Sequence, residues 1–181
     1  MTLADLIDLW KYAVALKFEE RRGWRKLRLN RIESVADHSF ALGLLALLEA
    51  GKRNYDVEKA VKLALMHDLE EAIIGDLTPR DKRIRGAARV RKERRLAVEE
   101  LLAKLPAKDR KSYARLWTDL RLQRTKEARL VHDLDKLEMA FQAREYAKKV
   151  GQERVRDFYQ SATKAIRDPA LRQVLNEVRR S

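Results

Sequence analysis

The chain has 181 residues and no cysteine, so its length suits one domain with a sizeable core, and disulfides and thiolate metal sites are excluded. No apolar run reaches the roughly 18 residues that a membrane-spanning helix needs, and the N-terminal MTLADLIDLWKY lacks the basic start of a signal peptide. We therefore expect a cytoplasmic protein with a single domain over residues 1–181.

The charge is strongly basic, with a formal net charge of +13 at pH 7. Such an excess favours a polyanionic partner or a phosphorylated substrate, although basic residues on helices often do no more than solvate an outer face. The basic residues gather at 21–31 (RRGWRKLRLNR) and 80–95 (RDKRIRGAARVRKERR). Nucleic acid and a phosphorylated small molecule both remain open from charge alone.

Helical periodicity begins at the N-terminus, where an apolar stripe runs from Leu3 to Val14. The segment 20–33 is basic and irregular. Ser34 has the features of an N-cap with Asp37 three residues later, which predicts a helix to about Ala50. Gly51 is placed to end that helix.

The rest of the chain also reads as helix. Asp56 can cap a helix that is predicted to reach Ile74, and the segment 75–81 (GDLTPRD) is predicted to be a loop. Thr125 and Asp168 are candidate caps, and Pro169 suits a first helical position. Further helices are expected at about 87–105, 109–121, 126–149, 153–166 and 169–179. No segment has a convincing strand pattern, so the predicted fold class is all-α.

Ligand-type side chains interrupt the most apolar of these helices, in LALMHDLEEAIIGDL (63–77). On a wheel of about 100° per residue, His67 falls on the apolar stripe, Glu71 about 40° away and Asp68 at the edge, about 100° away. An imidazole and a carboxylate that face a core cost several kcal/mol unless something satisfies them. A bound cation would satisfy both.

Two other predicted helices show the same pattern. His38 shares a face with Val35 and Leu42, and Asp135 shares a face with Val131 and Tyr146. Imidazole plus carboxylate is a donor set for Mn, Co, Zn, Fe or Ni. A core histidine is more often hydrogen-bonded and inert, and an aspartate more often ion-paired. The metal interpretation therefore depends on the coincidence across helices, and His132 remains a rival ligand.

Three ordered motifs resemble the HD-domain metal-dependent phosphohydrolases, in the branch of the 5′-deoxynucleotidases. They are ESVADH (33–38), HDLEEAIIGDLTP (67–79) and DLDKLEMAFQAREY (133–146). The likeness extends from RGW (22–24) to DFYQSATKAIRDPALRQVL (157–175), which is most of the chain. A bare His-Asp pair is weak, whereas the ordered set H…HD…D is specific.

The resemblance implies a single HD-domain helical bundle with one divalent transition metal buried per chain. The implied ligands are His38, His67, Asp68 and Asp135. Glu71 would handle the attacking water with Asp76 beside it, and Arg22 and Trp24 would contact substrate. The family places an arginine directly before the tryptophan, whereas here Gly23 intervenes.

The residues and the resemblance together predict release of phosphate from (deoxy)nucleoside 5′-monophosphates. A metal would supply hydroxide near neutral pH, and arginines of the 22–28 segment would bind phosphate by charge-assisted hydrogen bonds. Trp24 would stack on a base or sugar, unless it is an ordinary core residue; Asp76 would otherwise be a turn residue.

Three alternatives compete with this function. HD folds also support phosphodiesterase and nucleoside-triphosphate hydrolysis, since a fold does not fix chemistry. A basic helical nucleic-acid-binding protein is the third, but no helix-turn-helix or zinc-finger signature supports it. We further expect a homodimer, a small nucleotide substrate and no membrane partner.

Overall fold

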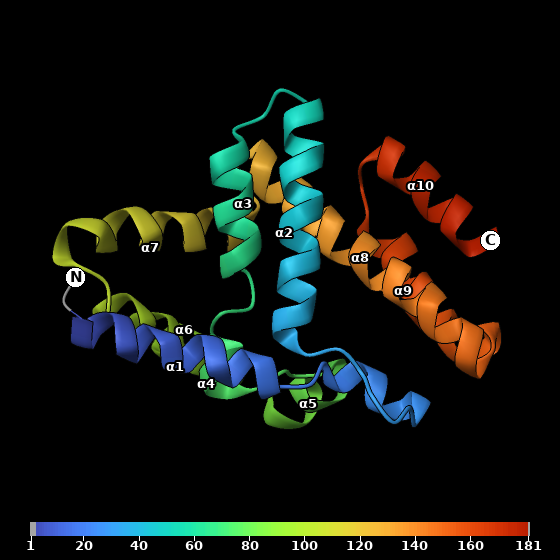
Figure 1. The fold of residues 1–181 in the computed structure, drawn as a ribbon, viewed down its shortest axis with the longest axis horizontal. Helices are drawn as coiled ribbons and strands as arrows, with labels where there is room; N and C mark the ends of the chain where they lie inside the picture. The colour runs from blue at the N-terminus through green and yellow to red at the C-terminus, as the bar shows by residue number, and fades with distance from the viewer. Residues whose placement is uncertain (1–2, 181) are drawn as a thin grey trace. The chain divides into compact units, whose positions relative to one another are not determined.

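The computed structural model describes residues 3–180, and all regular elements in that range are helices (Figure 1). A lone β-bridge between Glu20 and Ser34 is the nearest approach to a sheet among those residues. The predicted all-α fold class is therefore confirmed. In the described range, no helix combines the length and apolarity that crossing a bilayer requires.

Ten α-helices and two 3-10 helices (η1 and η2) make up residues 3–180. In chain order they are α1 (Leu3–Phe18), η1 (Arg22–Leu27), α2 (Val35–Lys52), α3 (Val57–Met66), α4 (Glu71–Ile74), α5 (Pro79–Arg85), α6 (Ala87–Ala103), α7 (Ala107–Leu122), α8 (Lys126–Val150), η2 (Gln152–Val155), α9 (Arg156–Ala165) and α10 (Pro169–Arg180).

The chain divides into two compact units, each built from two separate segments. Unit 1 comprises Met1–Ser39 and Met66–Thr118, and unit 2 comprises Phe40–Leu65 and Asp119–Ser181. The division falls inside α2, α3 and α7, so each of these helices contributes residues to both units.

Unit 1 is organised around the segment that leads into α2. The amide of Val35 donates to Glu19 O at 2.8 Å, and the amide of Arg21 donates to Glu33 O at 3.0 Å, so residues 19–21 and 33–35 run side by side. Helix α4 packs against α1 and α6, and α5 packs against α6. The apolar core of this unit includes Leu16, Leu27, Leu77 and Leu101.

Unit 2 is organised around α8, which packs against α9, α10 and η2 (Figure 1). Leu171, Leu175 and Val178 are buried at the i, i+4 and i+7 spacing that gives α10 one apolar face. Ala140 and Ala143 of α8 are fully buried, and their small side chains allow helices to approach closely.

The predicted helix caps are confirmed because each depends on local bonds. The Ser34 and Asp37 side chains exchange hydrogen bonds with each other's backbone amides, as a capping box requires. Asp56, Thr125 and Asp168 accept from the amides of Lys59, Ala128 and Leu171, respectively.

The end predicted for the second helix is wrong by two residues. Helix α2 continues through Gly51 to Lys52, and Asn54 adopts the left-handed conformation that terminates it, with φ of 53°. Amides of Asn54 and Tyr55 then bond to the carbonyls of Gly51 and Ala50. This is the Schellman pattern, with asparagine in the place where glycine was expected.

Two other predictions for the middle of the chain are wrong. The helix from Asp56 does not reach Ile74: α3 ends at Met66, residues 67–70 form turns, and α4 begins at Glu71. Successive amides there, such as Leu69 to Met66 O and Glu71 to Asp68 O, bond three residues back rather than four. The wheel angle of about 40° between His67 and Glu71 therefore does not hold.

The segment 75–81 is also not a loop throughout. Helix α5 begins at Pro79, and Thr78 and Asp81 form a second capping box before it. Proline at the first helical position was a signal for this helix, because it has no amide to leave unsatisfied there.

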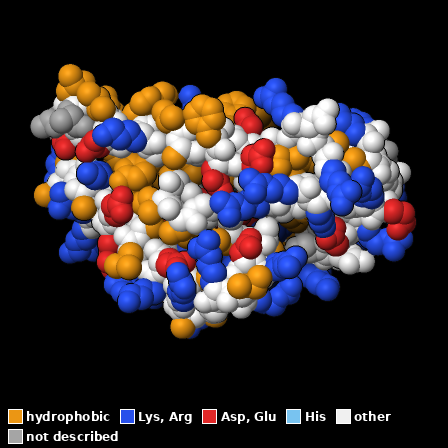
Figure 2. All heavy atoms as spheres, turned by 90° about the horizontal axis from the view of Figure 1, so that it is seen from below, with side chains coloured by type: hydrophobic (Ala, Val, Ile, Leu, Met, Phe, Trp, Pro, Cys, Tyr) orange, Lys and Arg blue, Asp and Glu red, His pale blue; other side chains and the backbone are white. Residues whose placement is uncertain are grey.

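Basic side chains are distributed rather than gathered into one patch on the face drawn in Figure 2. Lys and Arg spread over that face, with single Asp and Glu side chains between them. Many form ion pairs one helical turn apart, such as Arg89 with Glu93 and Arg95 with Glu99. Much of the positive charge therefore solvates helix surfaces.

Candidate metal centre

His38 lies in the first turn of α2 and is completely buried. The Ser34–Asp37 capping box fixes where that turn begins, and the bond from Val35 to Glu19 O ties it to the end of α1. The imidazole is thus held by local backbone geometry at a defined place in the core of unit 1.

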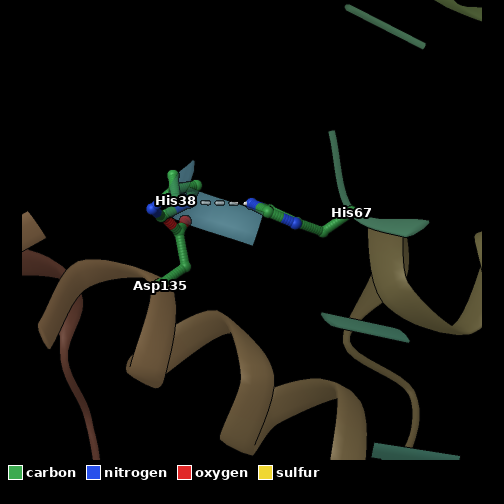
Figure 3. Close-up of side chains that lie close together, drawn as sticks. All are labelled: His38, His67 and Asp135. Atoms are coloured by element: carbon green, nitrogen blue, oxygen red, sulfur yellow. Dashed lines mark hydrogen bonds between the residues drawn. The ribbon is translucent and has the colours of Figure 1, made fainter. Parts of the chain in front are cut away.

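His67 lies between two further donor atoms, one from His38 and one from its neighbour Asp68. His67 Nε2 lies 3.0 Å from His38 Nε2, with the two rings at 60° to each other (Figure 3). The same His67 Nε2 lies 2.9 Å from Asp68 Oδ2. Residues 67–70 leave the α-helix, and the side chains of the neighbours His67 and Asp68 contact each other there.

These donors fit a transition-metal ion. Bonds from such ions to imidazole nitrogen or carboxylate oxygen are about 2.0–2.2 Å long, so two ligand atoms at a right angle lie roughly 3 Å apart. The separations of 3.0 and 2.9 Å match this value. Two imidazoles and a carboxylate also suit Zn, Mn, Fe, Co or Ni better than calcium.

Asp68 carries a second interaction that the sequence did not predict. Arg21 Nη1 lies 3.2 Å from Asp68 Oδ2, and Arg21 Nε lies 3.8 Å from Glu33 Oε1. The Arg21 side chain is mostly buried between these acids. The sequence motifs single out Arg22, whereas Arg21 is the arginine that contacts Asp68. The adjacent pair Arg21-Arg22 was the available signal for Arg21.

Glu71 opens α4 and is buried, with 4% of its surface exposed. Burial, and secondarily the nearby Asp68 and Asp76 carboxylates, raises the pKa of Glu71 well above its ordinary value. Its Oε2 atom accepts no hydrogen bond from any described residue. An unsatisfied buried carboxylate oxygen beside predicted metal ligands is able to accept a hydrogen bond from water or substrate.

Arg94 of α6 approaches this glutamate and the one before it. The guanidinium lies 3.7 Å from Glu71 Oε1 and 3.8 Å from Glu70 Oε1. Glu70 is also buried, and burial raises its pKa. The sequence had placed Arg94 in an undifferentiated basic run, so only the packing of α4 against α6 reveals its position.

Hydrogen bonds connect Asp76, just after the end of α4, to Arg22 and Glu19. Asp76 Oδ2 accepts the amide of Arg22 at 2.6 Å, and Glu19 Oε1 accepts both the Asp76 amide and Arg22 Nε at 3.0 Å. Gly75 adopts φ of 74° between them. Arg22 and Asp76 thus lie together, and their predicted roles toward substrate stay predictions.

Trp24 is a core residue, with 1% of its surface exposed. Its indole N–H donates to Glu33 Oε1 at 2.7 Å. Stacking on a base would require the segment 22–27 to open. The predicted substrate contact by Trp24 therefore stays a prediction that this placement does not favour.

Asp135 and His132 lie on α8 and belong to unit 2. Asp135 pairs with Lys136 Nζ at 2.8 Å. Burial lowers the pKa of His132, and Lys136 lowers it further, so this imidazole favours its neutral form. The roles of Asp135 as a ligand and of His132 as its rival stay predictions.

The sequence is similar to one family model and to several curated proteins. An HD-domain family model matches residues 13–175. The chain is 34% identical to the 5′-deoxynucleotidase HDDC2 of Xenopus laevis, over 96% of this chain and 86% of that protein. It is 32% identical to the 5′-deoxynucleotidase HDDC2 of Homo sapiens, over 96% of this chain and 84% of that protein.

Solved structures with a similar fold are also found. A conserved hypothetical protein from Pyrococcus furiosus matches with a TM-score of 0.78 and 32% identity, covering 97% of this chain and 99% of that one. A predicted metal-dependent phosphohydrolase from Magnetospirillum magnetotacticum, 21% identical, has the same fold with a TM-score of 0.69 over 98% of this chain and 95% of that one. With its histidine–aspartate centre and a family model that matches most of its length, the chain belongs to the HD-domain family.

Proposed function

We propose that this chain is a metal-dependent phosphohydrolase that releases inorganic phosphate from nucleoside 5′-monophosphates, with deoxynucleotides preferred. The observation that carries the proposal is that His67 Nε2 lies close to both His38 Nε2 and Asp68 Oδ2, near the buried Glu71 with its unsatisfied carboxylate oxygen. The substrate class follows the relatives named 5′-deoxynucleotidase, and the cytoplasm suits both that substrate and a chain without cysteine.

His38, His67 and Asp68 hold one divalent ion per chain in this proposal, and Asp135 supplies a fourth ligand. The support for Asp135 is its motif DLDK and its mostly buried carboxylate, which has 15% of the side chain exposed. When bound, the ion polarises a phosphate oxygen and lowers the pKa of a water molecule. One family model spans residues of both units, which supports treating residues 1–181 as one HD domain.

Glu71 takes the proton of the attacking water. Near a divalent cation its carboxyl group ionises at a lower pH than burial alone allows, because the positive charge stabilises the anion. Arg94 at 3.7 Å adds to that stabilisation and orients the carboxylate. The oxygen of Glu71 that lacks a donor among the described residues is then the proton acceptor.

The reaction forms a bond between water oxygen and phosphorus and breaks the bond to the ribose 5′-oxygen. The leaving oxygen takes a proton, and Asp76 is the acid that we assign to this position. Arg22, whose backbone amide donates to Asp76, and the buried Trp24 shape the substrate side of the site in this proposal.

A phosphate-release screen tests the function. Purified protein would be supplied with Mn²⁺, Co²⁺ or Zn²⁺ and offered ribo- and deoxyribonucleoside 5′-monophosphates, with 3′-monophosphates, triphosphates and cyclic nucleotides as controls. We expect orthophosphate from the 5′-monophosphates and a higher kcat/KM for the deoxy series. Pyrophosphate from triphosphates, or release from 3′ esters alone, contradicts the proposal; equal rates on both sugars contradict only the deoxyribose preference.

A further inference from the structure

A cavity of about 250 Å³ lies within unit 2, where the connection from α2 to α3, the first two turns of α8 and the α9–α10 connection meet. None of its lining side chains is a predicted metal ligand or a predicted catalytic or substrate-binding residue. We call it the cationic cavity. Its positive side chains are Arg53, Lys126, Arg129 and Arg167, and its acidic ones are Asp133 and Asp168. An excess of two positive charges therefore lines a space open to solvent.

The two carboxylates in the cavity are already engaged in hydrogen bonds within the protein. Asp133 Oδ2 accepts the amides of Arg167 at 3.0 Å and Asp168 at 2.8 Å. Asp168 caps α10 through the amide of Leu171 and receives two bonds from Arg53. These acids fix the walls of the cavity and are poorly placed to serve as ligands for a cation.

Three of the cations, in contrast, keep donor groups for a ligand. The Arg167 guanidinium is exposed and makes no hydrogen bond or ion pair with the described residues. Lys126 Nζ lies 4.4 Å from the centre of the Tyr55 ring and 4.0 Å from Glu127 Oε1, so its ammonium is loosely held. Arg129 donates to the carbonyls of Gln123 and Arg124 through Nη1 only.

The cavity faces away from the side of α8 that carries Asp135. At about 100° per residue, the cavity residues Lys126, Arg129, Leu130 and Asp133 fall between about 120° and 220° from Asp135 on the helix. One helix thus presents the predicted metal ligand on one side and the cationic cavity on the other. The cavity therefore lies on a face of α8 that does not carry Asp135.

We propose that the cationic cavity binds a small phosphate anion. A phosphate carries nearly two negative charges near neutral pH, which matches the excess of two positive charges. Arginine presents paired N–H donors in the geometry that phosphate oxygens require. The volume is below the roughly 300–1,000 Å³ of sites that enclose drug-sized ligands, so the phosphate group itself is the recognised part.

Calorimetry with inorganic phosphate tests the site at constant ionic strength. The titration is made in a His67→Ala background, which weakens phosphate binding at the proposed metal centre. The test variant adds Lys126→Gln and Arg167→Gln, and the matched control adds Lys149→Gln and Arg180→Gln. All four positions are exposed, and both pairs remove one lysine and one arginine. Circular dichroism melting curves verify that each variant folds.

We expect one phosphate per chain in the background protein and in the control, and at least about tenfold weaker binding in the test variant. The tenfold change corresponds to about 1.4 kcal/mol, which the loss of charge-assisted hydrogen bonds to the anion is expected to reach. Unchanged affinity in the test variant, or an equal loss in the control, overturns the proposal.

A second titration uses a nucleoside 5′-methylenephosphonate, which cannot be hydrolysed. Binding of inorganic phosphate identifies the free anion as ligand, whereas binding of only the phosphonate identifies an esterified phosphate; binding of neither overturns the site. Because these titrations measure heat of binding, they succeed or fail independently of the phosphatase screen.

Discussion

Burial separates Glu70 and Glu71 from the many glutamates on the outer surfaces of the helices. Both are less than 10% exposed, and each has one carboxylate oxygen without a hydrogen bond from the described residues. Arg94 stands 3.7–3.8 Å from the pair, farther than a direct hydrogen bond. Acids held in this way are costly for stability, and that cost is common where a site needs a proton acceptor.

The first residue-level prediction concerns Glu71. Glu71→Gln keeps the shape of the side chain but removes the proton acceptor, so we expect kcat to fall by about 10²-fold or more while metal content stays constant. Steady-state phosphate release and metal analysis of the same preparation measure both. Glu177→Gln, an exposed change on α10, should leave both values as they are. A near-normal rate in Glu71→Gln would exclude it as the general base.

Metal content distinguishes the ligands from their neighbours. His67→Ala removes the imidazole that lies 3.0 Å from His38 Nε2, so we expect bound metal and activity to fall together. His132→Ala should retain most of the metal, because our proposal gives that residue no bond to the ion. Elemental analysis of the two variants decides, and a metal-free His132→Ala protein would make His132 a ligand.

Acid should weaken the contact between Arg53 and Asp168. Their hydrogen bond lowers the pKa of Asp168, so the ion pair stabilises the fold fully above about pH 4 and loses its effect as pH falls through the folded-state pKa. Asp168→Asn keeps a good helix cap but removes the charge. Urea denaturation at pH 6 and pH 3 measures the free energy of unfolding of the wild-type protein and of Asp168→Asn. The difference between these two free energies should shrink at the lower pH. An unchanged difference would mean that the ion pair does not contribute.

At the scale of helices and turns, capping residues were predictable and interruptions were not. Ser34, Thr125 and Asp168 cap helices through side-chain bonds to amides three residues on, and such bonds depend only on local sequence. The break at 67–70 lies in an apolar run that looks helical. His67 leaves the helix where its imidazole meets that of His38, which is 29 residues away in the chain, and local periodicity does not record that contact.

In the candidate site, likewise, some residues were predictable from the sequence and others were not. The identities of His38, His67 and Asp68 were predictable because ligand-type side chains are conspicuous among apolar neighbours. Arg21 and Arg94 were not, since a basic chain offers many arginines and only tertiary packing selects the two that reach acids in the core. Trp24 could be read as a core residue or as a stacking surface until its indole was placed against Glu33.

Two glycines at helix ends provide a matched test of how tightly the Arg22 side chain is held beside Asp76. Gly75 and Gly86 both have positive φ, 74° and 83°, so alanine strains the backbone at either place. A Cβ at Gly75 would also lie 2.9 Å from Arg22 Nη2, whereas none of the described atoms beyond its own neighbours comes within 4 Å of a Cβ at Gly86. We expect Gly75→Ala to cost more stability than Gly86→Ala, by at most about 1 kcal/mol, because a displaced Arg22 side chain would lose its hydrogen bond to Glu19 Oε1. Equal melting temperatures would show that Arg22 adjusts freely.

At the scale of the whole molecule, exposed apolar side chains on α2 support the homodimer that we propose. Phe40, Leu44, Leu47 and Leu48 recur at helical spacing, and Phe40 is 72% exposed. A twofold axis would let one such stripe cover its own copy. Light scattering should give twice the chain mass of 21.2 kDa. Phe40→Glu with Leu48→Glu should give monomer, and Ile84→Glu, which is equally exposed on α5, should not. A monomeric wild-type protein at micromolar concentration would remove this proposal.

The interleaving of the two units determines when each can form as the chain leaves the ribosome. Residues 40–65 are made before the second half of unit 1, yet they belong to unit 2, whose remaining residues follow Thr118. A nascent chain that stops at Leu65 therefore carries His38 without His67, and unit 1 is complete only after residue 118 has emerged. Contacts between distant segments also slow folding. No single cut separates the two units: residues 1–118 contain all of unit 1 together with residues 40–65 of unit 2, and residues 40–181 contain all of unit 2 together with residues 66–118 of unit 1.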